Sequence, residues 1–325
     1  MSAKEIRIVF MGTPDFAVGS LSALVENGYN IVGVITAPDK PAGRGRQLSE
    51  SAVKKYAAEK KLNILQPEKL KNPEFISELE SLKADLQIVV AFRMLPEMVW
   101  NMPSMGTFNL HASLLPQYRG AAPLNWAVIN GETETGVTTF LLSHEIDTGQ
   151  IIFQEKVTIA ENDTVGDLHD RMMEIGAGLI LKTVNALAEG SVQPIDQTLL
   201  INDPEKIKQA PKIFKEDCRI DWTKDTESVR NLVRGLSPYP TAWTEFEHVE
   251  KNEILMAKIF AVSLDPGSMP AVPGTLKTDG KKYLKIACPD GWLSIDEIQL
   301  SGKKRMKTDE LLRGFHDLGD WQVRL

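Results

Sequence analysis

Apolar runs and helical spacings alternate through roughly the first 190 residues of the chain. The mostly apolar runs at 6–11 and 31–35 are typical of buried strands, and residues 16–26 between them have helical spacing. This order predicts a βαβ unit, and its repetition predicts parallel α/β winding. The further expected helices are 50–60 (capped by Ser49), 73–82, 123–129 and 163–188, and the further strands are 63–65, 86–91, 107–110, 137–142 and 151–159.

The pattern weakens after Gly190. Residues 190–209 are polar and rich in turn formers, which is typical of a linker. Beyond them, one helical stretch at 226–234 accompanies strand-like runs separated by turns, which favours a small β-barrel. At about 150 residues per domain, 325 residues correspond to roughly two domains, which we place at 1–189 and 210–325. The expected barrel strands are 241–246, 254–262, 274–276, 284–287 and 293–299.

Composition fits an ordinary globular chain, with 42% hydrophobic and 25% charged residues. No apolar run approaches the ~18 residues of a membrane helix, and the first residues carry charges where a secretory signal is apolar. We therefore expect a cytoplasmic protein that makes no membrane contact. The two cysteines, Cys218 and Cys288, lack CxxC spacing, which excludes a disulfide scaffold or cysteine-based zinc site and favours buried free thiols.

The net charge of -7 is unevenly distributed. Residues 1–206 contain 18 Lys+Arg and 26 Asp+Glu, whereas residues 207–325 contain 19 and 18. The second half is therefore nearly neutral, and clusters such as Lys303-Lys304-Arg305 are compatible with phosphate binding as well as with a solvated turn.

Two glycine-containing turns invite a nucleotide-binding interpretation that their spacing does not support. Gly12-Thr13-Pro14 lacks the later glycines of GxGxxG, and Gly43–Arg46 has no Lys-Ser/Thr at phosphate-loop spacing.

Asn109 and His111 are the strongest candidates for chemistry. They lie two residues apart on an expected strand, so their side chains share one face at the carboxyl end, where open α/β sheets bind ligands. Asp147 lies in a turn between two apolar strands and supplies a third polar group. The alternative is a structural Asn and His that end a strand.

Several motifs resemble the methionyl-tRNA formyltransferases, a family of folate-dependent formyltransferases, over essentially the whole chain. The resemblance implies a Rossmann-like catalytic domain followed by an OB-like barrel that binds tRNA. The matching segments are FMGTPDFA (10–17), APDKPAGRGR (37–46), NLHASLLP (109–116), YRGAAP (118–123), DTG (147–149), KI (212–213), KED (215–217), IDW (220–222) and RGL (234–236), with Pro238, Pro240 and Trp243.

The resemblance implies formyl transfer from 10-formyltetrahydrofolate to the α-amine of initiator methionyl-tRNA, by a monomer. Amine attack builds negative charge on the formyl oxygen, and the Asn109 amide and protonated His111 can donate hydrogen bonds to it. A nearby carboxylate, assigned to Asp147, favours the charged imidazole. Asp147, His111 or an ordered water then relays a proton from the amine to the folate nitrogen. No metal is expected, because the five histidines show no HxxxH pair.

By the same resemblance, Ser113, Leu114, Leu115 and Pro116 lie against the folate, although a proline-terminated core strand is the alternative. The sequence departs from the family at Phe92-Arg93, where Tyr-Gly is more common beside the folate pocket.

Lys40, Arg44 and Arg46 lie in a stretch with little apolar side chain, which predicts an exposed basic loop that contacts tRNA. A solvated basic turn is the alternative. Two other functions remain open: a formyltransferase for a small substrate such as a nucleotide sugar, which needs no basic loop, and a non-catalytic tRNA-binding module, which needs no catalytic set.

Overall fold

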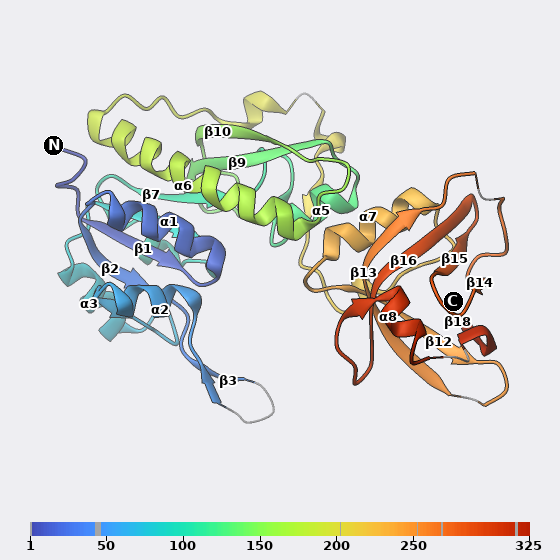
Figure 1. The fold of residues 1–325 in the computed structure, drawn as a ribbon. Helices are drawn as coiled ribbons and strands as arrows, with labels where there is room; N and C mark the ends of the chain where they lie inside the picture. Colours follow the sequence, from blue (N-terminus) through green and yellow to red (C-terminus); the bar gives the residue numbers. More distant parts are fainter. Residues whose placement is uncertain (1, 43–46, 202, 252, 268, 316–317) are drawn as a thin grey trace. The chain divides into compact units, whose positions relative to one another are not determined.

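The computed structural model describes residues 2–42, 47–201, 203–251, 253–267, 269–315 and 318–325 (Figure 1). The chain forms two compact units that are each assembled from three stretches of sequence. Unit 1 comprises Met1–Gly120, Glu134–Thr158 and His169–Gln209, and unit 2 comprises Ala121–Thr133, Ile159–Leu168 and Ala210–Leu325.

Unit 1 is built on a seven-stranded sheet. The five strands from β7 to β5 run parallel, and β9 and β10 continue the sheet in antiparallel fashion, which confirms the predicted α/β winding. The strand order is β10 (Ile151–Thr158), β9 (Glu134–Leu141), β7 (Thr107–His111), β6 (Leu86–Val90), β1 (Ile8–Gly12), β2 (Ile31–Ile35) and β5 (Ile64–Leu65).

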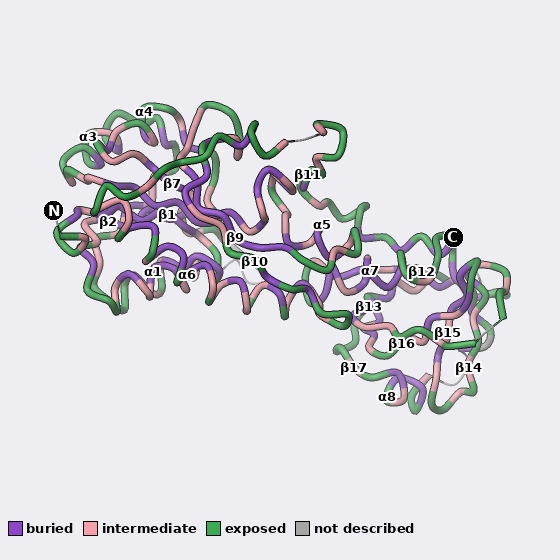
Figure 2. Tube along the Cα trace, turned by 90° about the horizontal axis from the view of Figure 1, so that it is seen from above, coloured by how far each residue is buried: buried purple, intermediate pink, exposed green. Residues whose placement is uncertain are grey.

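Helices cover both faces of this sheet because its central strands are apolar on both sides. All five residues of β1 are buried (Figure 2), and all five residues of β6 are buried as well. Val9 and Met11 point to one face, where they share a core with Phe75 and Leu79 of α3. The helices of this unit are α1 (Asp15–Glu26), α2 (Ala52–Glu59), α3 (Pro73–Ser81), α4 (Glu97–Trp100) and most of α6 (Val165–Glu189).

The predicted cap of α2 is wrong. Ser51, not Ser49, is the N-cap, and its Oγ accepts a hydrogen bond of 3.0 Å from the Lys54 amide. Ser49 instead ends β4 (Gln47–Ser49), which pairs in antiparallel fashion with β3 (Lys40–Ala42). Two serines that lie two residues apart carry the same local signal, and the pairing of Ser49 in the hairpin decides between them.

Unit 2 contains an antiparallel sheet that nearly closes into a barrel, as predicted. Its path runs from β14 to β18, and these two end strands lie near each other. Along β12, buried and half-buried residues alternate with the period of two expected of a barrel wall. The strand order is β14 (Leu276–Thr278), β15 (Leu284–Cys288), β16 (Gly291–Leu300), β13 (Ile254–Leu264), β12 (Ala242–His248) and β18 (Trp321–Val323), with β17 (Met306–Lys307) beside β16 and helices α5 (Pro123–Ile129), α7 (Thr226–Leu236) and α8 (Thr308–Leu312).

Residues 190–209 are mostly exposed, but hydrogen bonds and one buried side chain hold them to the rest of unit 1. Ile195 exchanges two 2.8 Å backbone hydrogen bonds with Ile151 of β10. Gln197, in the short 3-10 helix η1 (Gln197–Leu200), is fully buried. The Lys208 amide donates a 2.9 Å hydrogen bond to Oε1 of Gln117.

Limited proteolysis is expected to cut first within residues 190–209, because Leu199 and its neighbours are exposed and proteases act on accessible, polar chain segments. Mass spectrometry of the earliest fragments will locate the cut. Fragments that end within residues 137–159 would contradict the domain boundaries that we propose.

Both cysteines are buried free thiols, as expected. Burial, with Asp290 and Asp225 nearby, raises the pKa of Cys288 to about 12. Since the thiolate is the reactive form, almost none is present at pH 8. We expect neither thiol to react with Ellman's reagent in the native protein at pH 8, and both to react in denaturant. Rapid labelling of Cys288 in the folded chain would contradict this prediction.

Candidate functional site

The site begins at the carboxyl end of β7, where Asn109 and His111 share one face of the strand as predicted. Asn109 lies opposite Val89 of β6 and Phe140 of β9, so it is central in the sheet. Its amide is partly accessible and forms no hydrogen bond within the part of the chain that the structure describes. Two N–H donors are therefore available at this position.

The imidazole of His111 is held in one orientation. Its Nε2 lies 2.9 Å from the backbone oxygen of Tyr118, and the residue is only 7% exposed. Because a carbonyl oxygen only accepts hydrogen bonds, Nε2 carries a hydrogen. Nδ1 then faces Oδ2 of Asp147 at 3.8 Å. The nitrogen turned toward the carboxylate is thus the one that does not bond to Tyr118.

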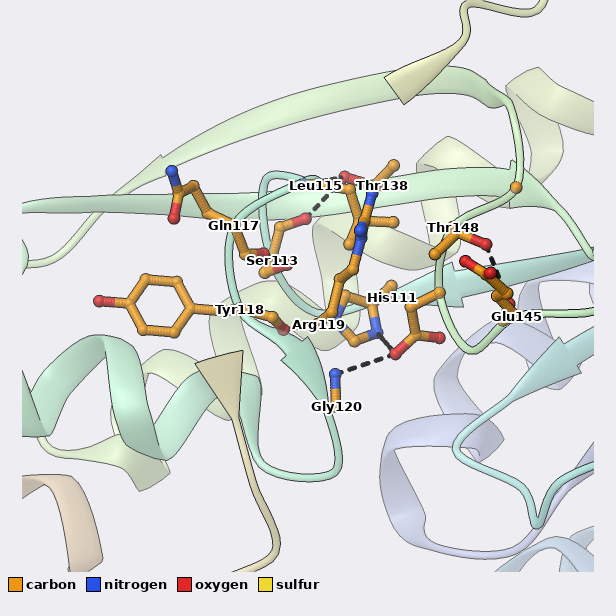
Figure 3. Close-up of polar contacts among 12 residues, drawn as sticks. His111, Ser113, Leu115, Gln117, Tyr118, Arg119, Gly120, Thr138, Glu145 and Thr148 are labelled. Carbon is orange, nitrogen blue, oxygen red and sulfur yellow. Dashed lines mark hydrogen bonds and ion pairs between the residues drawn. The ribbon is translucent and has the colours of Figure 1, made fainter. Parts of the chain in front are cut away.

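Asp147 lies in the loop between β9 and β10, in the left-handed region with φ 56°. Aspartate tolerates this conformation better than most residues. Its Oδ2 accepts a 3.0 Å hydrogen bond from the Gly120 amide (Figure 3). The carboxylate is therefore aimed at His111 by contacts from a different loop, and the structure brings these two predicted residues together.

The turn of residues 113–117 is internally hydrogen-bonded. The fully buried Ser113 donates from Oγ to the Gln117 oxygen at 2.6 Å and accepts from Oγ1 of Thr138 at its own carbonyl, also at 2.6 Å (Figure 3). Leu115 packs against Phe140, whereas Leu114 is partly exposed and Pro116 is buried. The Ser113 hydroxyl is thus committed to the turn, and folate contact by these four residues stays a prediction.

Two residues of this site were missed as functional candidates. Arg119 donates to Oε1 of Gln197 from Nε at 3.1 Å and from Nη2 at 2.6 Å. Gln197 in turn donates from Nε2 to the Asp147 oxygen at 2.9 Å and to the Gly149 oxygen at 2.7 Å. Arg119 stands inside the matching YRGAAP motif, but Gln197 lies in a polar, turn-rich stretch that gives no signal of burial.

The loops after β2 and β6 contain the remaining predicted residues. Lys40 is exposed in β3, whereas Arg44 and Arg46 lie outside the described residues. Asp39, directly before β3, accepts hydrogen bonds from Lys54 and Gln66, which lower the pKa of its carboxyl. Arg93 donates to the backbone oxygens of Glu68 and Pro67, so its charge is directed to the loop after β5.

Within the described ranges, no cluster of three or more His, Cys, Asp or Glu side chains is arranged to hold a metal ion. Among the same residues, no helix has the length and apolar character needed to span a membrane.

Both halves of the chain match family models. Residues 6–184 match the family described as formyl transferase, and residues 212–316 match the formyl transferase C-terminal domain. The chain is 58% identical over 316 residues to a protein of Bacteroides fragilis named methionyl-tRNA formyltransferase, with 97% of each chain covered. The protein of that name from Bacteroides thetaiotaomicron is 59% identical over 315 residues, also with 97% of each covered.

Solved structures show the same fold at lower identity. WlaRD, a sugar 3N-formyl transferase solved with dTDP and 5-N-formyl-THF, is 22% identical with a TM-score of 0.63, covering 92% of this chain and 99% of its own. HypX from Aquifex aeolicus, solved with tetrahydrofolic acid, is 19% identical with a TM-score of 0.63, covering 99% of this chain and 51% of its own. At these identities the likeness supports the fold alone.

Proposed function

This chain belongs to the formyl transferase family, and from that premise we propose that it transfers the formyl group of 10-formyltetrahydrofolate to the α-amine of methionyl-tRNA. The product, N-formylmethionyl-tRNA, serves translation initiation. The observation that carries this proposal is the 58% identity, over 97% of the chain, to a relative named methionyl-tRNA formyltransferase. Since that identity spans both matched domains, it concerns the whole enzyme rather than the shared fold.

The oxyanion of the transition state has two donors in the proposed mechanism. The neutral amine attacks the formyl carbon, and negative charge develops on the formyl oxygen. The unpartnered amide of Asn109 and Nδ1–H of protonated His111 donate to that oxygen. The hydrogen bond from Nε2 to Tyr118 keeps the ring from turning, so Nδ1 stays on the side that faces Asp147, where the proposed mechanism places the formyl oxygen.

Asp147 balances the charge and moves the proton. Its carboxylate lies 3.8 Å from Nδ1, within ion-pair distance but too far for a short hydrogen bond, so its negative charge offsets positive charge on the ring during the reaction. As the new N–C bond forms, the amine loses a proton, and as the folate C–N bond breaks, the folate nitrogen gains one. Asp147, with His111 or an ordered water, carries that proton between them.

A formylation assay with the purified full chain tests the function. We expect 10-formyltetrahydrofolate to be consumed with methionyl-tRNA, and at most about a hundredth of that rate with free methionine, since tRNA contacts position the amine. An amino-sugar nucleotide is the control for the small-substrate alternative. Rapid formylation of that nucleotide with none of methionyl-tRNA would reject the proposal.

We propose that Lys40, Arg44 and Arg46 contact tRNA phosphates. Replacing Arg44 and Arg46 by Gln is then expected to weaken tRNA binding and to reduce the slope of log K against log salt by about one unit per lost contact. The KM for the folate should stay within about twofold of the original, because phosphate contacts position the tRNA alone.

The exposed Lys71, which lies outside residues 40–46, provides a control on unit 1, since Lys71→Gln removes one surface charge from another segment of the chain. An unchanged salt slope in the arginine variant would reject direct phosphate contact. Equal losses for folate and tRNA would place the loop in the folate pocket or in the fold itself.

A further inference from the structure

Gln197 is a fully buried polar side chain in an otherwise exposed stretch of chain. Burying an amide costs free energy unless its hydrogen-bonding groups find partners. Asp196 caps the short helix that begins at Gln197, and Ile195 pairs with Ile151 of β10. The backbone before Gln197 is therefore fixed to the sheet of unit 1. A stretch that needed only to connect two domains would not bury this group.

The four hydrogen-bonding positions of the Gln197 amide are all used. Arg119 has donors only, so the atom facing its guanidinium must be Oε1. Nε2 therefore faces the two backbone oxygens of Asp147 and Gly149, which only accept. All four contacts require the same orientation of the amide, with Oε1 toward Arg119 and Nε2 toward the two carbonyls.

The hydrogen bonds from Gln197 reach the loop at Asp147, the residue of that loop with a left-handed backbone. Asp147 has φ 56°, in the left-handed region that residues with a Cβ atom adopt only when their surroundings hold them there. Gln197 fixes the carbonyl of Asp147 itself and the carbonyl two residues later. The turn that supplies Arg119 also supplies the Gly120 amide, which orients the carboxylate.

We infer that Gln197, oriented by Arg119, is a positioning residue that holds Asp147 beside His111. The inference rests on the proposed function, since it assigns a role within that reaction. Gln197 acts on the backbone of the loop and contacts no reacting atom. Its loss lets the Asp147 carboxylate move away from the 3.8 Å approach to Nδ1.

Gln197→Met is the direct test because methionine has a similar length and no hydrogen-bonding amide. We expect kcat to fall about 10- to 100-fold, since a displacement of about 1 Å can cost 10²-fold. The KM values for folate and methionyl-tRNA should stay within about threefold. Gln197→Glu keeps the acceptor for Arg119 but places an oxygen against the carbonyl oxygens of Asp147 and Gly149. We expect it to remain folded and to lower kcat about as much as Gln197→Met does.

Gln117→Met is the matched control. The Gln117 amide also binds two backbone groups of the 190–209 stretch, at Lys206 and Lys208, but it has no contact with Asp147. A general loosening of this stretch would lower activity in both variants. We expect Gln117→Met to keep kcat within about threefold of the original chain.

A double-mutant cycle separates positioning from stability. In an Asp147→Ala background, Gln197→Met is expected to lower kcat by less than about twofold, because the group that it positions is gone. A full additional loss in that background, or an original-level kcat in Gln197→Met, would overturn the inference. Failure of the unmutated chain to formylate methionyl-tRNA would instead reject the proposed function.

Discussion

His111→Ala is expected to lower kcat for methionyl-tRNA formylation by about 10² to 10³, the usual loss when one oxyanion donor is removed. Nδ1 of His111 is the donor beside Asp147, and the ring is already oriented by Tyr118, so no neighbouring group replaces it. Asn109→Ala and Asp147→Ala should each lower kcat by a factor of at least about 10². Single-turnover rates with saturating folate and tRNA will measure the chemical step.

Asp147→Asn is the informative control for charge. It keeps the side-chain shape and the acceptor for the Gly120 amide but removes the carboxylate. Full activity with unchanged thermal stability would reject the role of the charge. Because the three residues act as a unit, the triple variant should lose far less than the product of the single losses.

Gly149→Ala is expected to reduce the free energy of unfolding by about 3 kcal/mol and to reduce kcat about as much as Asp147→Ala. A Cβ atom at Gly149 would lie 1.6 Å from the backbone oxygen of Leu141, which cannot move without distorting the end of β9. The loop that holds Asp147 must then shift. Chemical denaturation and steady-state kinetics on the same samples will measure both losses.

Gly178→Ala is the matched control for this substitution. Gly178 is exposed within α6, and an added Cβ atom there meets nothing within 4 Å. Alanine in a helix interior is favoured over glycine by about 0.5–1 kcal/mol, so this variant should be slightly more stable and fully active. Equal stability of Gly149→Ala and Gly178→Ala would contradict the close approach at Gly149.

Strong periodicity made the sheet of unit 1 predictable. β2 has the predicted bounds, Ile31–Ile35, because a continuous apolar run bounded by turns leaves little choice. The last pieces of unit 2 were not predicted. β18 and α8 are short, and β18 is defined by pairing with β12, more than seventy positions earlier, a contact that local pattern does not contain.

Part of the candidate site could likewise be predicted from the sequence, and part could not. The period of two placed Asn109 and His111 on one face, and the polar turn between two apolar strands pointed to Asp147, which the structure places beside His111. Gln197 was not predicted as a site residue, because a polar residue among prolines and glycines predicts an exposed turn. Its burial arises from a guanidinium 78 positions away in the sequence and two carbonyls about 50 positions away.

The interleaving of the two units along the chain limits how relatives of this protein can recombine. In unit 2, α5 packs against α7: Asn125 donates a 2.8 Å hydrogen bond to the Gly235 oxygen, and a Cβ atom at Gly235 would lie 2.5 Å from Cγ1 of Ile129. A chimaera with one crossover near residue 190 would pair α5 of one parent with α7 of the other. Exchange of the barrel therefore succeeds only between parents matched at these positions, or when residues 121–133 and 159–168 travel with it.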